Sequence, residues 1–286
     1  MRKWHRYQIN PGKKQAYGGI DTTFDDHKRS MGGYSCREGY GTREEFFKKY
    51  IFEGDRRMKH YHQCLADSIK ITDRILSIGS GRCANELFFV DKGFNILCSD
   101  LGQPCKDETR RLFPELMFKN IDILSDIIDG GFDCVISFSM FYLFGQEKIL
   151  DLFKKIYGLI KPGGKFILDP GAAEDNSITY IIDEVICPLE ARIAGLLRWR
   201  NPFIISKKHH GYRSRNNEII SIAKKAGFTF NDLSAGDYLT ETERSRIFGR
   251  LPIKLREAVG RHAPYVRIFT FVKEKNAGAL KRGDHE

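Results

Sequence analysis

The sequence predicts an α/β fold with a doubly wound, mostly parallel sheet. Residues 75–78 form a short apolar run that ends at Gly79-Ser80-Gly81, and a helical apolar pattern begins directly after these glycines. A second apolar run ends at Asp100. Strand patterns then alternate with helical patterns, which is the order expected when helices connect parallel strands. The further elements expected are strands at 116–120, 132–138 and 165–169 and helices at 103–113 and 147–159.

The glycine turn predicts a nucleotide-binding βαβ unit. In an open parallel sheet, ligands bind outside the carboxyl ends of the strands, where glycines let the backbone approach the ligand and a helix N-terminus offers free N–H groups. Asp100 lies about 20 residues beyond the glycines, the distance at which an acid reaches ribose hydroxyls in such a unit. We therefore expect an adenosine-type ligand. The spacing Gly79-x-Gly81-x-x-Ala84 would also suit a dinucleotide, so the turn alone does not separate the two.

Four segments together resemble the class I S-adenosylmethionine-dependent methyltransferases. They are ILSIGSG at 75–81, Asp100 after the second strand, FDCVISFSMFYL at 132–143, and LIKPGGKFIL at 159–168. The resemblance covers about residues 55–275, and the later motifs favour this family over dinucleotide dehydrogenases. It implies S-adenosyl-L-methionine as the cofactor. It also implies a seven-stranded sheet with an antiparallel last strand, for which strand patterns occur at 228–233 and 266–272.

The resemblance also implies which residues hold this cofactor. Asp100 would bind the ribose, and Asp122 and Ile123 would contact the adenine. The chain departs from the family at Ser77, where an acid is usual two positions before the first glycine, and at Cys83, where the family has its third glycine. Both positions lie where the methionine end of the cofactor would lie. The full set of expected cofactor contacts is Ser77, Gly79, Ser80, Gly81, Asp100, Leu101, Asp122, Ile123, Ser137 and Phe138.

Three parts are expected along the chain. Residues 1–54 are interpreted as an N-terminal lid or flexible segment, because their first 45 residues are polar, glycine-rich and without a helical or strand period. The methyltransferase domain spans 55–275, and 276–286 form a tail. Two insertions, at about 170–215 and 238–264, are interpreted as a helical cap over the substrate. An ordinary helix pair that completes the core is the alternative for the first insertion.

The composition indicates a soluble, cytoplasmic protein. The sequence contains no apolar run of about 18 residues and no apolar segment near its N-terminus, which excludes a membrane span and a secretory signal. The seven cysteines contain no Cys-x-x-Cys pair and are expected to be reduced, structural thiols. Residues 1–60 carry 14 Lys and Arg against 8 Asp and Glu, 61–191 carry 13 against 20, and 192–286 carry 20 against 9. These basic flanks suggest an acidic acceptor or surface, or they are solvated faces without a partner.

Methyl transfer from a sulfonium is an in-line displacement, so the site mainly has to position the acceptor. A general base is needed only for a hydroxyl or a protonated amine. The candidates for a base are Tyr142, Asp169 and His210. Residues 137–140 read Ser-Phe-Ser-Met and lack the (Asp or Asn)-Pro-Pro-(Tyr or Phe) signature of many nucleic-acid and amide N-methyltransferases. This favours a small-molecule or saccharide acceptor. We expect no metal site, because the adjacent His209 and His210 cannot face one ion from a helix or a strand.

Three hypotheses about function stay open. The first is methyl transfer to a small-molecule or saccharide acceptor that carries an acidic group. The second is an RNA-modifying or RNA-binding methyltransferase, for which the basic flanks contain interleaved aromatic residues such as Trp4 and Trp199. The third is a non-catalytic scaffold of the same fold, motivated by Ser77 and Cys83. The oligomeric state is left open.

The first insertion also raises the hypothesis of peripheral contact with an anionic membrane. Its apolar, aromatic and basic residues have the composition of an amphipathic helix at a lipid surface. The acidic residues Asp183, Glu184 and Glu190 oppose this hypothesis, because a negative face would be repelled by anionic lipid.

Overall fold

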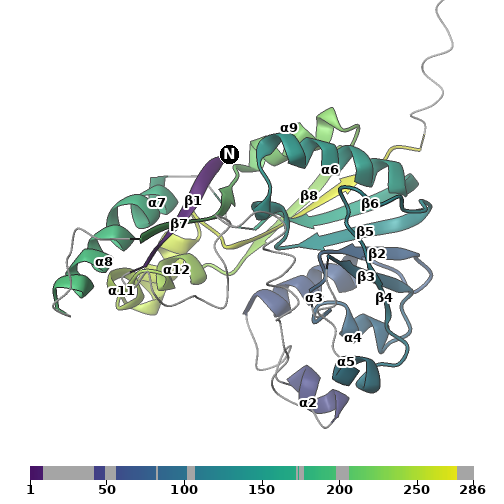
Figure 1. Cartoon of the computed structure of the whole chain (residues 1–286), viewed down its shortest axis with the longest axis horizontal. Helices are drawn as coiled ribbons and strands as arrows, with labels where there is room; N and C mark the ends of the chain where they lie inside the picture. Colours follow the sequence, from purple (N-terminus) through teal and green to yellow (C-terminus); the bar gives the residue numbers. More distant parts are fainter. Residues whose placement is uncertain are drawn as a thin grey trace, which may run out of the picture.

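The computed structural model describes residues 1–8, 42–48, 56–81, 83–101, 107–171, 173, 177–197 and 206–275. They form two lobes, and the larger lobe is built on a seven-stranded sheet (Figure 1). The strands follow one another in the sheet in the order β4 (Met117–Asn120), β3 (Ile96–Asp100), β2 (Ile75–Ile78), β5 (Phe132–Phe138), β6 (Ile160–Asp169), β9 (Val266–Val272) and β8 (Thr229–Gly236).

The strand directions confirm the predicted fold class. β4, β3, β2, β5 and β6 pair in parallel, and β9 is antiparallel to both of its neighbours, β6 and β8. All four residues of β2 are buried, as expected for a central parallel strand covered on both faces. The carboxyl ends of β4, β3, β2 and β5 consequently meet at one edge of the sheet.

Helices cover the two faces of the sheet. Successive side chains of a strand point to opposite faces, so Ile75 packs into the core on one face while Leu76 packs into the core on the other. The first face is covered by α2 (Arg43–Phe47), α3 (Arg56–Ser68), α4 (Leu87–Val90) and α5 (Asp107–Leu112). The second is covered by α6 (Gln146–Leu159) and α9 (Asn216–Lys225).

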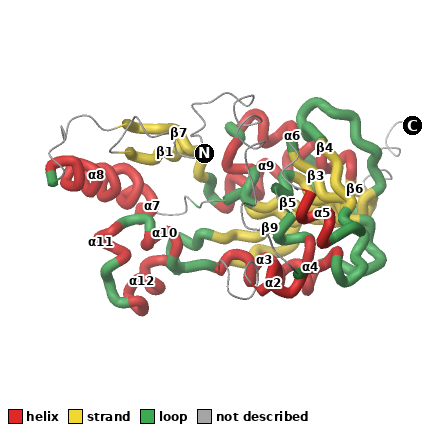
Figure 2. Tube along the Cα trace, turned by 60° about the horizontal axis from the view of Figure 1, so that its bottom comes forward, coloured by secondary structure: helices red, strands yellow, loops and turns green. Residues whose placement is uncertain are grey.

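The smaller lobe, called the side lobe below, lies beside the second half of the sheet (Figures 1 and 2). Its centre is a two-stranded antiparallel sheet of β1 (Arg2–Gln8) and β7 (Ser206–Arg213). None of the helices in the described part of the chain has both the length and the apolar character of a membrane span. The side lobe also contains α7 (Ser177–Ile181), the π-helical turn η3 (Ile182–Ile186), α8 (Cys187–Leu196), α10 (Thr240–Glu243), α11 (Arg246–Gly249) and α12 (Ile253–Gly260).

The strand β1 was not expected from the sequence, because the first 45 residues show no strand period. The structure explains this: the buried surroundings of β1 are charged as well as apolar. Trp4 is only 1% exposed, and the guanidinium groups of Arg213 and Arg244 lie 4.4 and 4.6 Å from its ring. The proposed lid continues into residues 9–41, which lie outside the described residues, as does the tail at 276–286.

An ion-pair network joins the elements of the side lobe. Arg213 on β7 is fully buried, and its Nε donates to Asp183 Oδ2 (2.6 Å) while its Nη2 donates to Glu241 Oε2 (3.0 Å). Arg244 contacts the same two carboxylates. Burial alone would raise the pKa of Glu241, but Arg213 and Arg244 lower it to about 2. Glu241 is therefore ionised, and the two carboxylates fix η3 and α10 to β7.

Candidate active site

The sheet brings the expected cofactor residues together at one edge. Ser77 is the third residue of β2, Asp100 ends β3, and Ser137 and Phe138 end β5. Asp122 follows β4 directly after residue 121. Because these strands are neighbours and parallel, the residues that follow them line one side of the larger lobe.

The glycine turn has the backbone geometry that glycine allows. Gly79 and Gly81 have positive φ angles of 69° and 55°. A Cβ atom on Gly79 would lie 2.7 Å from Met140 Sδ, whereas one on Gly81 would meet no atom within 4 Å. The turn is therefore open at Gly81. Cys83 has a positive φ of 58°, so it adopts the conformation that a glycine would adopt at this position without strain.

The carboxylate of Asp100 fixes the glycine turn to the end of β3. Its Oδ2 accepts the N–H of Gly81 (2.8 Å) and its Oδ1 accepts the N–H of Leu101 (2.7 Å). Ser80 adds a bond from its hydroxyl to the carbonyl of Ser99 (3.1 Å). Since each carboxylate oxygen accepts more than one hydrogen bond, Asp100 retains capacity for ribose hydroxyls.

Three of the expected contacts are engaged within the protein. The side chain of Ile123 is 3% exposed and packs into the core. The hydroxyl of Ser137 is buried and donates to the carbonyl of Ile78 (3.1 Å). Phe138 stacks on Tyr61, with ring centroids 4.4 Å apart and an interplanar angle of 7°.

Sequence reasoning missed Glu86, the residue just before α4. Its carboxyl is 2% exposed, and the hydroxyl of Ser77 donates to Oε1 (2.6 Å). Oε2 is buried and has no hydrogen-bond partner among the described residues. Burial raises the pKa of Glu86 to about 7. The sequence contained one signal for this residue. Ser77 stands where the resembled family has an acid, and Glu86 is the nearest acid after the glycine turn.

Two thiols lie beside this carboxyl. The sulfur atoms of Cys83 and Cys98 and a carboxylate oxygen of Glu86 all lie within 4.8 Å of one another. All three residues are buried, and a structural zinc site usually needs four ligands. We therefore describe these three residues as part of the buried surroundings of the glycine turn. That the protein binds no metal stays a prediction.

A buried polar cluster connects α3 with the ends of β5 and β6. Asp169, fully buried, accepts the N–H of Gly171 at Oδ1 (2.8 Å) and the hydroxyl of Tyr61 at Oδ2. The Tyr61 oxygen also lies 3.0 Å from Ser139 Oγ. Burial raises the pKa of Asp169 and, together with the Asp169 charge, raises the pKa of Tyr61 well above its usual value.

The structure divides the three candidate bases into two groups. Asp169 belongs to the cluster with Tyr61, whereas Tyr142 and His210 lie together with ring centroids 5.7 Å apart. Tyr142 is on the 3-10 helix η2 (Phe141–Leu143). A Cβ atom on Gly171 would approach the Tyr142 ring to 3.0 Å, so this ring lies close behind the Asp169 loop.

One cation lies beside the Tyr61 cluster. The guanidinium of Arg57 is 5.3 Å from the centroid of the Tyr265 ring. Burial raises the pKa of Tyr265, and the positive charge of Arg57 opposes that rise. The same charge opposes the larger rise in the pKa of Tyr61.

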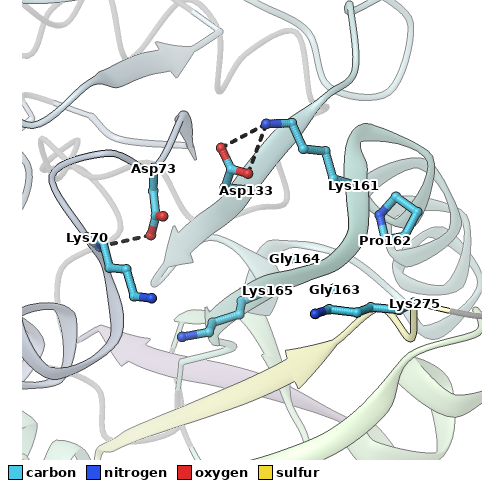
Figure 3. A pocket seen from close by; sticks show the side chains of 9 residues that line it. All are labelled: Lys70, Asp73, Asp133, Lys161, Pro162, Gly163, Gly164, Lys165 and Lys275. Atoms are coloured by element: carbon cyan, nitrogen blue, oxygen red, sulfur yellow. Dashed lines mark hydrogen bonds and ion pairs between the residues drawn. The ribbon is translucent and has the colours of Figure 1, made fainter.

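A pocket on the opposite edge of the sheet is not part of this site. It lies at the amino ends of β2, β5 and β6, and Lys161 pairs there with Asp133 at 2.9 Å (Figure 3). A carboxyl-end ligand cannot reach it, because the sheet separates the two edges. Its lining residues are Lys70, Asp73, Asp133, Lys161, Pro162, Gly163, Gly164, Lys165 and Lys275.

Comparison with known proteins identifies the family that the central part of the sheet resembles. Residues 76–168 match a family described as methyltransferase domain, and this range includes β2 to nearly the end of β6. No curated protein matches the sequence.

Solved structures show the same fold at low sequence identity. Magnesium protoporphyrin IX methyltransferase from Synechocystis PCC 6803, with bound SAH, is 15% identical with a TM-score of 0.52, and the match covers 91% of each chain. For 1,6-didemethyltoxoflavin-N1-methyltransferase from Burkholderia thailandensis the identity is 13% and the TM-score 0.51, over 79% of this chain and 81% of that chain. For a putative sarcosine dimethylglycine methyltransferase from Galdieria sulphuraria the values are 17% and 0.50, over 88% and 99%.

Proposed function

We propose that the chain, whose residues 76–168 match a methyltransferase domain, transfers a methyl group from S-adenosylmethionine to a small-molecule or saccharide acceptor that carries an acidic group. The observation that carries this proposal is the cluster of Tyr61, Ser139 and Asp169, which places proton-accepting groups at the carboxyl ends of β5 and β6.

The carboxyl edge fits the cofactor. When bound, S-adenosylmethionine supplies a sulfonium methyl group for displacement. The open turn at Gly81 leaves room for a ligand, and the unpartnered buried oxygen of Glu86 offers a negative charge for the ammonium of the methionine end. Glu86 would thus supply the acid that Ser77 lacks. Asp100 would hold the ribose, and Asp122 would contact the adenine.

The Tyr61 cluster suits an acceptor that loses a proton. A hydroxyl acceptor needs a base, since its oxygen is a weak nucleophile while protonated. In our proposal Tyr61 takes the acceptor proton as its own proton passes to Asp169 Oδ2. The acceptor oxygen would then bond to the methyl carbon as the bond between that carbon and the sulfonium sulfur breaks, which leaves S-adenosylhomocysteine. Ser139 orients the phenol, and the raised pKa of Asp169 makes this carboxylate a better proton acceptor than a solvated one.

Arg57 supports an acidic group on the acceptor. Its guanidinium lies beside Tyr265, and a guanidinium binds a carboxylate or phosphate through two parallel hydrogen bonds. The carboxylate of the cofactor is the competing ligand for Arg57.

The class of acceptor follows from what the chain lacks after β5. Residues 137–140 read Ser-Phe-Ser-Met, which is not the amide-binding signature of many nucleic-acid and protein N-methyltransferases. The toxoflavin and protoporphyrin enzymes of the same fold are named for small-molecule acceptors. These names support a small acceptor without identifying it.

The test uses S-adenosylmethionine with a labelled methyl group and the full-length protein. We expect label to enter a small-molecule or saccharide fraction of a cell extract, and the Tyr61→Phe variant to lose most of this transfer. Arg57→Gln should raise KM for the labelled acceptor and leave the Kd for S-adenosylhomocysteine unchanged.

Each other outcome excludes one part of the proposal. Label in the RNA fraction would favour the RNA-modifying alternative, and cofactor binding without transfer to any fraction would favour the scaffold. A weaker affinity of Arg57→Gln for S-adenosylhomocysteine would assign Arg57 to the cofactor carboxylate.

A further inference from the structure

Exposed apolar side chains are concentrated on the side lobe. Thirteen large hydrophobic residues of the described chain are exposed, and ten of them belong to α7, η3, α8, the residue after α8, α11 and α12. A soluble monomer rarely exposes a contiguous apolar patch above a few hundred Å² without a use for it. The ten residues are Tyr180, Ile181, Val185, Leu189, Ile193, Leu196, Leu197, Ile247, Ile253 and Leu255.

Four of these residues form one stripe along α7, η3 and α8. Ile181, Val185, Leu189 and Ile193 follow one another at intervals of four residues, so their side chains lie on one face. They are between 43% and 53% exposed, so the stripe points to solvent. The helices α7 and α8 lie at the end of the molecule farthest from β4, with α11 and α12 beside them (Figures 1 and 2).

Basic residues accompany the apolar stripe. Arg192 is exposed and lies between Leu189 and Leu196 at helical spacing. Arg246, Arg250 and Lys254 are exposed among the apolar residues of α11 and α12. No ion pair is found for these four cations within the described residues. Among the described acids of α8, α11 and α12, Glu190 and Glu257 are both half-buried.

The acids that argue against an anionic surface are engaged inside the side lobe. Asp183 is fully buried between Arg213, Arg2 and Arg244. Glu184 binds Arg2 at 3.2 Å.

Glu190 is likewise occupied at the junction of α8 and α11. Its carboxylate accepts the hydroxyl of Ser245 (2.5 Å) and the N–H groups of Arg246 (3.0 Å) and Ile247 (2.9 Å). It therefore binds the N-terminal turn of α11 to α8 and joins the two halves of the exposed face. The net charge of that face is positive.

The positive charge of this face favours an anionic lipid surface over a second copy of the chain as its binding partner. A second copy of the chain would bring Arg192, Arg246, Arg250 and Lys254 against the same four cations, and like charges across an interface are repulsive. An anionic lipid surface offers both a partner for the cations and an apolar layer for the stripe.

We infer that the outer face of α7, α8, α11 and α12 binds peripherally to an anionic membrane. The helices lie in the plane of the interface: the stripe enters the boundary between headgroups and acyl chains, and the cations contact lipid phosphates. This places the side lobe, and the carboxyl edge of the sheet next to it, at the lipid surface. The inference does not depend on which acceptor is methylated.

The test is flotation of the purified full-length protein with vesicles of phosphatidylglycerol and phosphatidylcholine, compared with vesicles of phosphatidylcholine alone. We expect binding to the first and little to the second, with loss of binding at high salt because exposed charges are screened. The variant Arg246→Gln with Arg250→Gln should bind the anionic vesicles about 30-fold more weakly, since each cation near such a surface contributes about 1 kcal/mol.

Matched variants distinguish binding through this face from a general effect of surface charge or of exposed apolar residues. Leu189→Glu with Ile193→Glu should abolish flotation, whereas Ile71→Glu with Ile127→Glu, on exposed residues of the larger lobe, should leave it unchanged. Lys224→Gln with Lys225→Gln on the exposed side of α9 is the control for charge. Each variant should keep the parent Kd for S-adenosylhomocysteine, which shows that it is folded.

The inference is wrong if the protein does not float with anionic vesicles. It is also wrong if flotation is unaffected by Leu189→Glu with Ile193→Glu, or if neutral vesicles bind equally well. A parent that sediments as a dimer and a Leu189→Glu, Ile193→Glu variant that sediments as a monomer would assign the face to a second copy instead.

Discussion

Ser77 and Glu86 exchange the positions of hydroxyl and acid around the glycine turn. The methyltransferases that this chain resembles usually have an acid at the position of Ser77, and here the serine hydroxyl binds the buried carboxyl of Glu86. The acid is therefore near the same place but comes from the start of α4 instead of from β2.

The variant Glu86→Gln tests whether this charge meets the cofactor ammonium. We expect it to weaken binding of S-adenosylhomocysteine by about 1.5 to 3 kcal/mol, the size of a hydrogen bond to a charged group. Binding of 5′-methylthioadenosine, which lacks the amino-acid end, should not change. Calorimetric titration of both ligands measures the difference.

The pH dependence gives a second readout of the same residue. The pKa of Glu86 is about 7 in the folded protein, so the carboxylate is charged above this pH and neutral below it. Affinity of the parent for S-adenosylhomocysteine should fall as the pH is lowered through 7, and Glu86→Gln should remove that dependence. The double variant Ser77→Glu with Glu86→Ser should restore affinity. Equal affinities of parent and Glu86→Gln at pH 8 would exclude the contact.

Asp100→Ala should weaken cofactor binding by about 1.5 to 3 kcal/mol, because the ribose hydroxyls lose a charged acceptor. The substitution also removes the bonds to the amides of Gly81 and Leu101, so circular dichroism must show that the variant is folded. A folded variant with the parent Kd would mean that Asp100 only holds the turn.

At the scale of single elements, the long periodic segments were predictable and the short charged ones were not. The strands at 132–138 and 266–272 carry apolar runs that only a buried strand explains, and the helix predicted at 147–159 begins one residue earlier in the structure. The strand at 2–8 was missed because its partners include buried arginines, whose positions depend on acids far away in the sequence.

The same limit applies to the candidate site. Asp100 and the glycine turn follow from local spacing, and the structure places them together. The pairing of Tyr61 with Asp169 joins α3 to the end of β6 across 108 residues. No local sequence pattern predicts this pairing. Tyr61 could therefore be distinguished as a candidate site residue from the other polar residues of α3 only once the fold was known.

The Tyr61→Phe variant tests the proton-accepting cluster that α3 completes. The phenylalanine ring retains the stack on Phe138 but loses the hydroxyl that binds Asp169. We expect kcat to fall by about 10²- to 10⁴-fold, the range for loss of acid–base catalysis, while the Kd for S-adenosylhomocysteine stays within about twofold.

The matched control is Tyr142→Phe, on the neighbouring loop, which should retain activity if Tyr61 and not Tyr142 handles the proton. Loss of activity in Tyr142→Phe with an active Tyr61→Phe would reverse the assignment.

At the scale of the whole molecule, a substitution of Arg213 tests whether the side lobe unfolds separately from the larger lobe. Arg213→Met leaves the buried carboxylates of Asp183 and Glu241 without their main partner, and loss of one member of a buried pair typically costs about 3 to 5 kcal/mol. We expect urea unfolding to report a loss of this size and hydrogen exchange to increase first in β1 and β7.

Arg246→Met is the control, because Arg246 is exposed and such substitutions usually change stability by less than about 0.5 kcal/mol. If Arg213→Met accelerated exchange equally in β2 and β5, the two lobes would unfold as one unit.

The pairing of β1 with β7 also sets an order of events during synthesis. Residue 2 lies opposite residue 213 in this sheet, so β1 has no partner until more than 200 further residues have been made. At about 5 to 20 residues per second this interval is roughly 10 to 40 seconds. Four strands of the larger sheet, β2 to β5, are complete by residue 138, well before that time. The sheet of β1 and β7 therefore closes only after the first four strands of the larger sheet have been made, and until then Trp4 remains without the arginines that bury it.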